Sequence, residues 1–234
     1  MPRDKTFDLL HDALAKPGCA ICRLEREHVQ RYLDGFMYED VTDVQLRAKM
    51  RAAQGFCHEH CVQAIRVRDS LGLAIIYQDI LSTVNKQMGD AMSSPRLPSP
   101  GLLRRNPPAG ARVARQITAQ RSCPACAVRD EMTHVALETL MQNVTESLLG
   151  PIFQTSDGLC LPHLRRALAQ AGEAAAIKTL VDRQSEVISR LNAELAEFIR
   201  KHDHRFRHEQ MGGERDSWKR AIDMAVGQAA GERE

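Results

Sequence analysis

Residues 55–61 read GFCHEHC, and this short stretch brings together four side chains that can bind a transition metal. The four candidates are Cys57, His58, His60 and Cys61. Taken alone, the stretch does not show which of them are ligands. The answer also decides the fold, because a metal ion held here would join this part of the chain to a distant one.

A second stretch, GLCLPHL at residues 158–164, repeats the spacing of glycine, cysteine and histidine. When the two are aligned, Cys57 corresponds to Cys160, and His60 corresponds to His163. Leucines take the places of the other cysteine and the other histidine. The shared CxxH pattern therefore predicts one cysteine and one histidine ligand in each stretch, and it makes His58 a bystander.

Each of these stretches follows a CxxC pair at a nearly constant distance. The pairs are Cys19 with Cys22 and Cys123 with Cys126. The segment between CxxC and CxxH has 34 residues in the first half of the chain and 33 in the second. Such constant spacing predicts an internal duplication, with two homologous halves in one chain.

Three thiolates and one imidazole per half match the ligands of a closed, tetrahedral structural zinc site. The spacing predicts Cys19, Cys22, Cys57 and His60 as site 1, and Cys123, Cys126, Cys160 and His163 as site 2. We therefore expect two Zn²⁺ per chain, each joining the starts of two helices. An iron–sulfur cluster is the alternative cofactor, since such clusters are also held mainly by cysteine.

The hydrophobic pattern predicts an all-α protein whose two halves pack through long helices. The domain boundaries that we expect are a first zinc-binding repeat at 1–92, a linker at 93–121, and a second repeat with a C-terminal helix at 122–234. A heptad stripe between Ile177 and Phe198 predicts that the last long helix packs along a helix at about 74–92.

The linker is rich in proline and arginine. Residues 93–110 contain five prolines, which interrupt helices, and residues 91–122 contain six arginines and no acidic residue. A solvated linker is the simpler interpretation. Contact with nucleic acid is the alternative, although no aromatic side chain is present there to stack on a base.

Cys61 is the one cysteine outside the two predicted sites. We interpret it as a small core residue, and the alternative is a zinc-dependent redox sensor in which this thiol displaces a ligand on oxidation. Two ExxH pairs, Glu25 with His28 and Glu131 with His134, are out of register between the halves. We therefore interpret them as surface or boundary side chains. We find no catalytic motif.

Composition narrows the class of protein further. The formal net charge is +2, which gives no global field for nucleic acid or membrane binding. No apolar run approaches the roughly 20 residues of a membrane span. Seven cysteines, an odd number with four in CxxC pairs, favour metal binding over a secreted disulfide framework. We expect a cytoplasmic protein with no membrane partner.

Several segments together resemble an uncharacterised bacterial family of unknown function with duplicated CxxC and CxxH half-sites. The segments are GCAICRLEREHVQRYLDGFMYEDV, GFCHEH, CPACAVRDE, GLCLPHLRRAL and WKRAI. The resemblance implies the same eight metal ligands but no activity, substrate or partner. The sequence as a whole thus predicts a non-enzymatic, zinc-binding helical scaffold or protein-interaction module.

Overall fold

The computed structural model describes residues 5–93 and 110–228, and this described part contains helices and no strands. The predicted all-α class is confirmed. The helices are α1 (Lys5–Leu14), α2 (Ala20–Gly35), the π-helical turn η1 (Phe36–Asp40), α3 (Val44–Ala53), α4 (His58–Arg66), α5 (Ser70–Ser93), α6 (Ala111–Gln116), α7 (Pro124–Asn143), α8 (Leu149–Thr155), α9 (Leu161–Gln170), α10 (Ala174–His202), the 3₁₀ turn η2 (Gly213–Asp216) and α11 (Ser217–Val226). None of the helices in this part of the chain has the length and apolar character needed to cross a membrane.

The chain forms two compact units that do not follow the predicted ranges 1–92 and 122–234. Unit 1 consists of residues 1–28 and 129–234, and unit 2 of residues 29–128. The boundaries fall inside α2 and inside α7. Each unit therefore contains parts of both predicted halves.

Unit 1 has a core drawn from six helices of both chain segments. Its fully buried side chains include Leu10 of α1, Ile21 of α2, Leu137 of α7 and Phe153 of α8. Leu159, in the loop before α9, is buried with them. Burial of large apolar side chains supplies most of the free energy that holds such a unit together.

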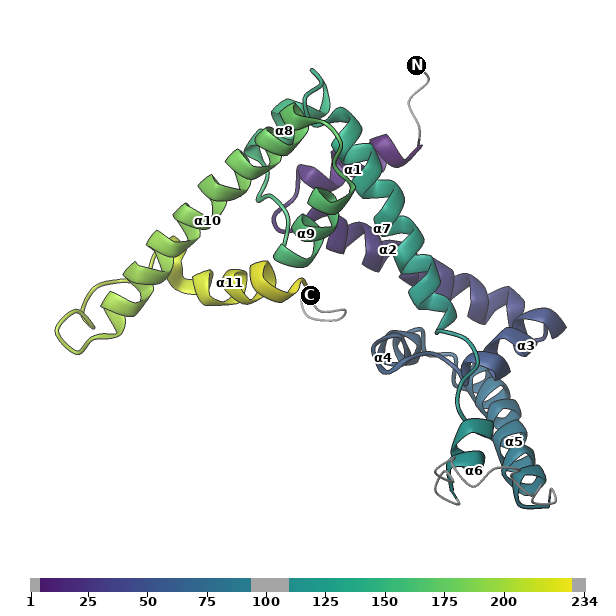
Figure 1. Ribbon diagram of the computed structural model, residues 1–234. Coiled ribbons are helices and arrows are strands. Elements are labelled where there is room, and N and C mark those ends of the chain that lie inside the picture. The colour runs from purple at the N-terminus through teal and green to yellow at the C-terminus, as the bar shows by residue number, and fades with distance from the viewer. Residues whose placement is uncertain (1–4, 94–109, 229–234) are drawn as a thin grey trace, which may run out of the picture. The chain divides into compact units, whose positions relative to one another are not determined.

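Helix α10 belongs to unit 1, and α11 turns back from it to contact both α10 and α9 (Figure 1). The buried face of α10 includes Leu180, Gln184, Val187 and Leu191. The predicted stripe is only partly right, because Val181 is 42% exposed and the apolar face is rotated by about one residue. The expected partner helix near 74–92 corresponds to α5, which belongs to unit 2, and the pairing stays a prediction.

Unit 2 has its own core around the end of α2. Phe36 is buried there and meets Phe56 edge to face, with ring centroids 5.5 Å apart. Helix α5 packs against α3, and Asp79 of α5 accepts ion pairs from Arg47 and Arg51 of α3. This unit is therefore held by an apolar core and by a half-buried charge cluster at its edge.

Most of the predicted linker, residues 94–109, lies outside the described residues. Its C-terminal part is more ordered than a solvated linker requires, because α6 packs against α5. Beyond α6, the backbone N–H groups of Gln120 and Arg121 both donate to the carbonyl oxygen of Ala52, at 2.8 and 3.1 Å. These bonds fix the chain just before the second CxxC pair.

The burial pattern predicts where a cavity destabilises the protein most. Phe153→Ala removes a fully buried ring from unit 1, and we expect unfolding to become easier by about 3–5 kcal/mol. Leu148→Ala is the matched control, because Leu148 is 50% exposed. It should lower the free energy of unfolding by less than about 1 kcal/mol. Urea denaturation followed by circular dichroism measures both. Equal destabilisation by the two variants would contradict the assigned core.

Candidate metal centres

The structure gathers the eight predicted ligand side chains into two groups of four. The first cluster is Cys19, Cys22, Cys160 and His163, and the second cluster is Cys57, His60, Cys123 and Cys126. Within each cluster the candidate ligand atoms all lie within 4.8 Å of one another. Both clusters thus offer three sulfur atoms and one imidazole nitrogen.

The predicted pairing of half-sites is wrong. Each CxxC pair meets the CxxH pair of the other half, so Cys22 lies beside Cys160 and not beside Cys57. The physical reason is the length of the helices that follow the CxxC pairs. Helix α2 has 16 residues, about 24 Å, and it carries the chain from unit 1 into unit 2 before Cys57 is reached. Helix α7, with 20 residues, carries the chain back.

The first cluster is assembled at the starts of α2 and α9. The sulfur atoms of Cys22 and Cys160 are 3.6 Å apart. Nδ1 of His163 lies 3.1 Å from the sulfur of Cys160, 3.4 Å from that of Cys22 and 3.5 Å from that of Cys19. All four side chains are buried.

The second cluster is assembled in the same way at the starts of α4 and α7. The sulfur atoms of Cys57 and Cys126 are 3.7 Å apart. Nδ1 of His60 lies 3.3 Å from Cys57, 3.4 Å from Cys126 and 3.5 Å from Cys123, each measured to sulfur. Cys57 and Cys126 are only half-buried, so this cluster is nearer to solvent than the first.

Both CxxH turns have the same backbone conformation. Cys57 and Cys160 are the N-cap residues of α4 and α9, with φ of −66° in each case. A glycine in the left-handed region stands two residues before each cysteine: Gly55, with φ of 93°, before Cys57, and Gly158, with φ of 68°, before Cys160. A side chain there would be strained, and its Cβ would lie 2.9 Å from Tyr77 or 2.8 Å from Gln184. The duplication itself stays a prediction.

Glu25 gives the imidazole of the first cluster a carboxylate partner. Its Oε1 is 3.0 Å from Nε2 of His163, while Nδ1 of the same ring faces the sulfur atoms. The Thr133 hydroxyl also donates to Glu25. A carboxylate on the far nitrogen fixes the ring orientation and makes the imidazole a stronger ligand. Glu25 was expected to be a surface or boundary residue, and its position one turn after Cys22 was the available signal.

The close contact of the groups in the first cluster shifts their pKa values. Burial lowers the pKa of His163, but hydrogen bonds with Cys160, Cys19 and Glu25 outweigh it and raise that pKa to about 12. Burial opposes ionisation of Cys19, yet hydrogen bonds from Cys160, Cys22 and His163 hold its pKa well below the usual value. The arrangement therefore favours a thiolate beside a protonated imidazole, and a bound cation would replace the imidazole proton.

The C-terminal segment adds a donor that the sequence did not reveal. The backbone N–H of Gln228 donates to the sulfur of Cys22 at 3.5 Å. The preceding residue, Gly227, has φ of 89°, a left-handed conformation that favours glycine. An N–H bond stabilises a thiolate ligand. No residue type marks a backbone donor, so the sequence held no signal for it.

Cys61 and His58 lie outside both clusters. His58 is exposed, as expected of a bystander. The Cys61 sulfur is 2.8 Å from the Tyr77 hydroxyl oxygen and donates to the Phe56 carbonyl oxygen at 3.4 Å. Burial, and then the bond with Cys61, raises the pKa of Tyr77. Cys61 is thus a half-buried side chain packed on the core of unit 2.

The crossed pairing can be tested by oxidation of metal-free protein. The sulfur of Cys22 lies beside that of Cys160, so we expect a disulfide between these two residues. For the same reason we expect a disulfide between Cys57 and Cys126. Mass spectrometry of proteolytic fragments identifies the linked peptides. A dominant link between Cys22 and Cys57 would instead favour the uncrossed pairing.

The role of Glu25 predicts a selective loss of metal affinity. Glu25→Gln keeps the size of the side chain but removes the charge beside His163, so we expect the first cluster to bind zinc about 10–100-fold more weakly. Competition with a zinc chelator measures the affinity of both clusters, and the second cluster should be unchanged. Glu131→Gln, on the exposed face of α7, is the matched control. Equal effects of the two substitutions would exclude a positioning role.

Comparison with known proteins gives a family but no activity. No solved structure matches the chain. An uncharacterised 23.9 kDa protein from the xynA 3′ region of Caldicellulosiruptor sp. (strain Rt8B.4) is 36% identical over 63 residues, which are 27% of this chain. The match spans 30% of that relative's length. The model of a family of unknown function, DUF6062, matches residues 6–232, and the chain therefore belongs to this family.

Proposed function

We propose that the protein is a zinc-binding helical scaffold in which each cluster holds one structural Zn²⁺. The observation that carries this proposal is the spacing of the ligand atoms. A tetrahedral ion with Zn–S bonds of about 2.3 Å places two sulfur ligands about 3.8 Å apart, and with a Zn–N bond of about 2.0 Å it places sulfur and nitrogen about 3.5 Å apart. The clusters have sulfur separations of 3.6 and 3.7 Å. Their sulfur–nitrogen separations are 3.1–3.5 Å.

The same geometry favours a single ion over an iron–sulfur cluster. An iron–sulfur cluster distributes its cysteine ligands over two or more iron atoms, which moves the ligand atoms apart. Here the four candidate atoms of each group all lie within 4.8 Å of one another, close enough to share one ion. Three thiolates and one imidazole are the donors that zinc prefers.

A scaffold role follows from the closed ligand set. In each cluster all four tetrahedral positions would be taken by protein atoms, which leaves no open position for a substrate. A structural zinc site can contribute about 10 kcal/mol or more to folding, comparable with the net stability of a whole domain. In this proposal the metal maintains the two units, and function lies in the surface that they present.

The partner that we propose is another protein. Helix α11 carries Trp218, Ile222 and Val226 at spacings of four, so they lie along one helical face, and they are 44%, 53% and 69% exposed. Exposed apolar stripes of this kind commonly take part in protein contacts. The alternative of nucleic acid depends on the arginine-rich segment 91–122, half of which lies outside the described residues.

Elemental analysis of purified protein tests the metal assignment directly. We expect two zinc per chain, and one zinc in either Cys22→Ser or Cys126→Ser, because each substitution removes one ligand from one cluster. Cys61→Ser is the matched control and should keep two. If the analysis instead finds iron and sulfide, and the protein absorbs visible light, the cofactor is an iron–sulfur cluster and not zinc. Peroxide-induced zinc release that Cys61→Ser abolishes would favour the redox sensor.

A further inference from the structure

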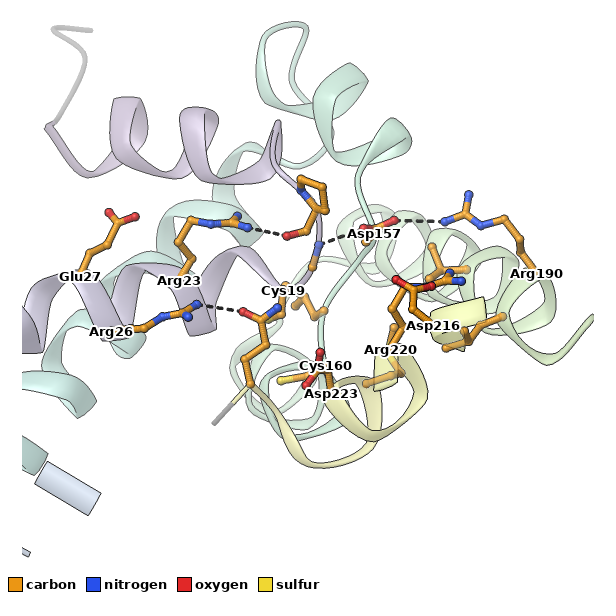
Figure 2. A pocket seen from close by; sticks show the side chains of 17 residues that line it. Cys19, Arg23, Arg26, Glu27, Asp157, Cys160, Arg190, Asp216, Arg220 and Asp223 are labelled. Atoms are coloured by element: carbon orange, nitrogen blue, oxygen red, sulfur yellow. Dashed lines mark hydrogen bonds and ion pairs between the residues drawn. The ribbon is translucent and has the colours of Figure 1, made fainter. Parts of the chain in front are cut away.

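Unit 1 contains a cavity of about 560 Å³ that the metal-site interpretation does not use (Figure 2). Its walls come from the turn before α2, the first turns of α2, the loop before α9, the middle of α10, and α11. Its volume falls within the range of about 300–1,000 Å³ typical of small-molecule sites. Cys19 and Cys160 of the first cluster also border it, but their exposed fractions are only 6% and 1%.

One side of the cavity is apolar. Leu159, Val187 and Leu191 line it and are 0%, 4% and 7% exposed, and Met224 of α11 lies with them. These side chains come from the loop before α9, from α10 and from α11. They offer a surface against which the hydrocarbon part of a ligand can be removed from water.

The cavity is also bordered by four arginines and by four acidic side chains, which are Glu27, Asp157, Asp216 and Asp223. Two of the arginines are paired with carboxylates. Arg190 donates to Asp157 at 3.2 Å. Arg220 donates to Asp216 at 2.8 Å and also pairs with Glu194. These two arginines therefore have ionic partners within the protein and need none from a ligand.

Arg23 and Arg26 are bonded differently, because their hydrogen bonds go to uncharged oxygen atoms. Arg23 donates to the Ala13 carbonyl oxygen at 2.7 Å and to that of Pro17. Arg26 donates to the side-chain oxygen of Gln228 at 3.0 Å, a contact drawn as a dashed line from Arg26 in Figure 2.

Arg23 and Arg26 both border the cavity. An anionic group beside them would gain charge-assisted hydrogen bonds, which are stronger than bonds to uncharged oxygen atoms.

We propose that this cavity binds a small organic anion with an apolar body. Its anionic group accepts hydrogen bonds from Arg23 and Arg26, in place of the uncharged Gln228 oxygen at Arg26. Its apolar body lies against Leu159, Val187 and Leu191. The anionic group is a carboxylate or a phosphate, which share this chemistry. The inference is independent of the metal, since no ligand atom needs to contact the first cluster.

The fluorescent probe 1-anilinonaphthalene-8-sulfonate tests the cavity, because it combines an anionic group with an apolar body. We expect one probe to bind per folded chain, with a rise in its emission. Arg26→Gln should weaken binding about tenfold or more, the effect of losing one charge-assisted hydrogen bond. Arg165→Gln removes the same charge from an exposed position on α9 outside the cavity, and it should leave the affinity unchanged.

A second variant separates the cavity from general surface charge. Leu191→Trp fills the apolar side without changing any charge, so it should also abolish probe binding. Displacement by octanoate, or by 1-naphthyl phosphate, then identifies the anionic group as a carboxylate or a phosphate. Equal affinity in the Arg26 and Arg165 variants would overturn the proposal, and so would displacement by neither compound. The zinc content is measured separately and does not bear on this result.

Discussion

The crossed contact between CxxC and CxxH pairs is the constraint on which the rest of the structure depends. Cys22 and Cys160 are 138 residues apart, and yet their sulfur atoms lie 3.6 Å from each other. Cys57 and Cys126 are 69 residues apart and meet in the same way. Neither unit can therefore form from one predicted half alone, because unit 1 joins residues 1–28 to 129–234 and unit 2 spans residues 29–128. Each of the two cores, like the cavity of unit 1, lies in a unit that contains one of these clusters.

The sequence identified the chemistry of the site far better than its topology. The comparison of GFCHEHC with GLCLPHL separated Cys57 and His60 from Cys61 and His58, because residue type and spacing are local properties. The choice of partner for each CxxC pair is not local. The intervening distances along the chain were almost equal in both halves, so spacing could not distinguish a crossed from an uncrossed arrangement. Only the length and direction of α2 and α7 decide it.

Burial patterns were likewise predictable in kind but not in detail. The periodicity of α10 correctly indicated one apolar face. Which residues form that face depends on contacts with α11 and with the loop before α9, where the Leu159 N–H donates to the Gln184 side-chain oxygen at 3.0 Å. The contacts of Glu25 and Gln228 with the first cluster also depend on tertiary position. A glutamate in a helix, or a backbone donor after a glycine, has no distinctive pattern in one sequence.

The crossed arrangement imposes an order on the synthesis of the protein. As the chain leaves the ribosome, the second cluster has all its ligands once Cys126 has emerged, whereas the first cluster must wait for His163. During that interval Cys19 and Cys22 lack the two partners with which they form the first cluster. A cut anywhere in residues 94–109 would separate the ligands of both clusters, although the chain appears divisible there on composition alone. Residues 94–109, whose sequence is rich in proline, thus join the two ligand pairs of each cluster along the chain.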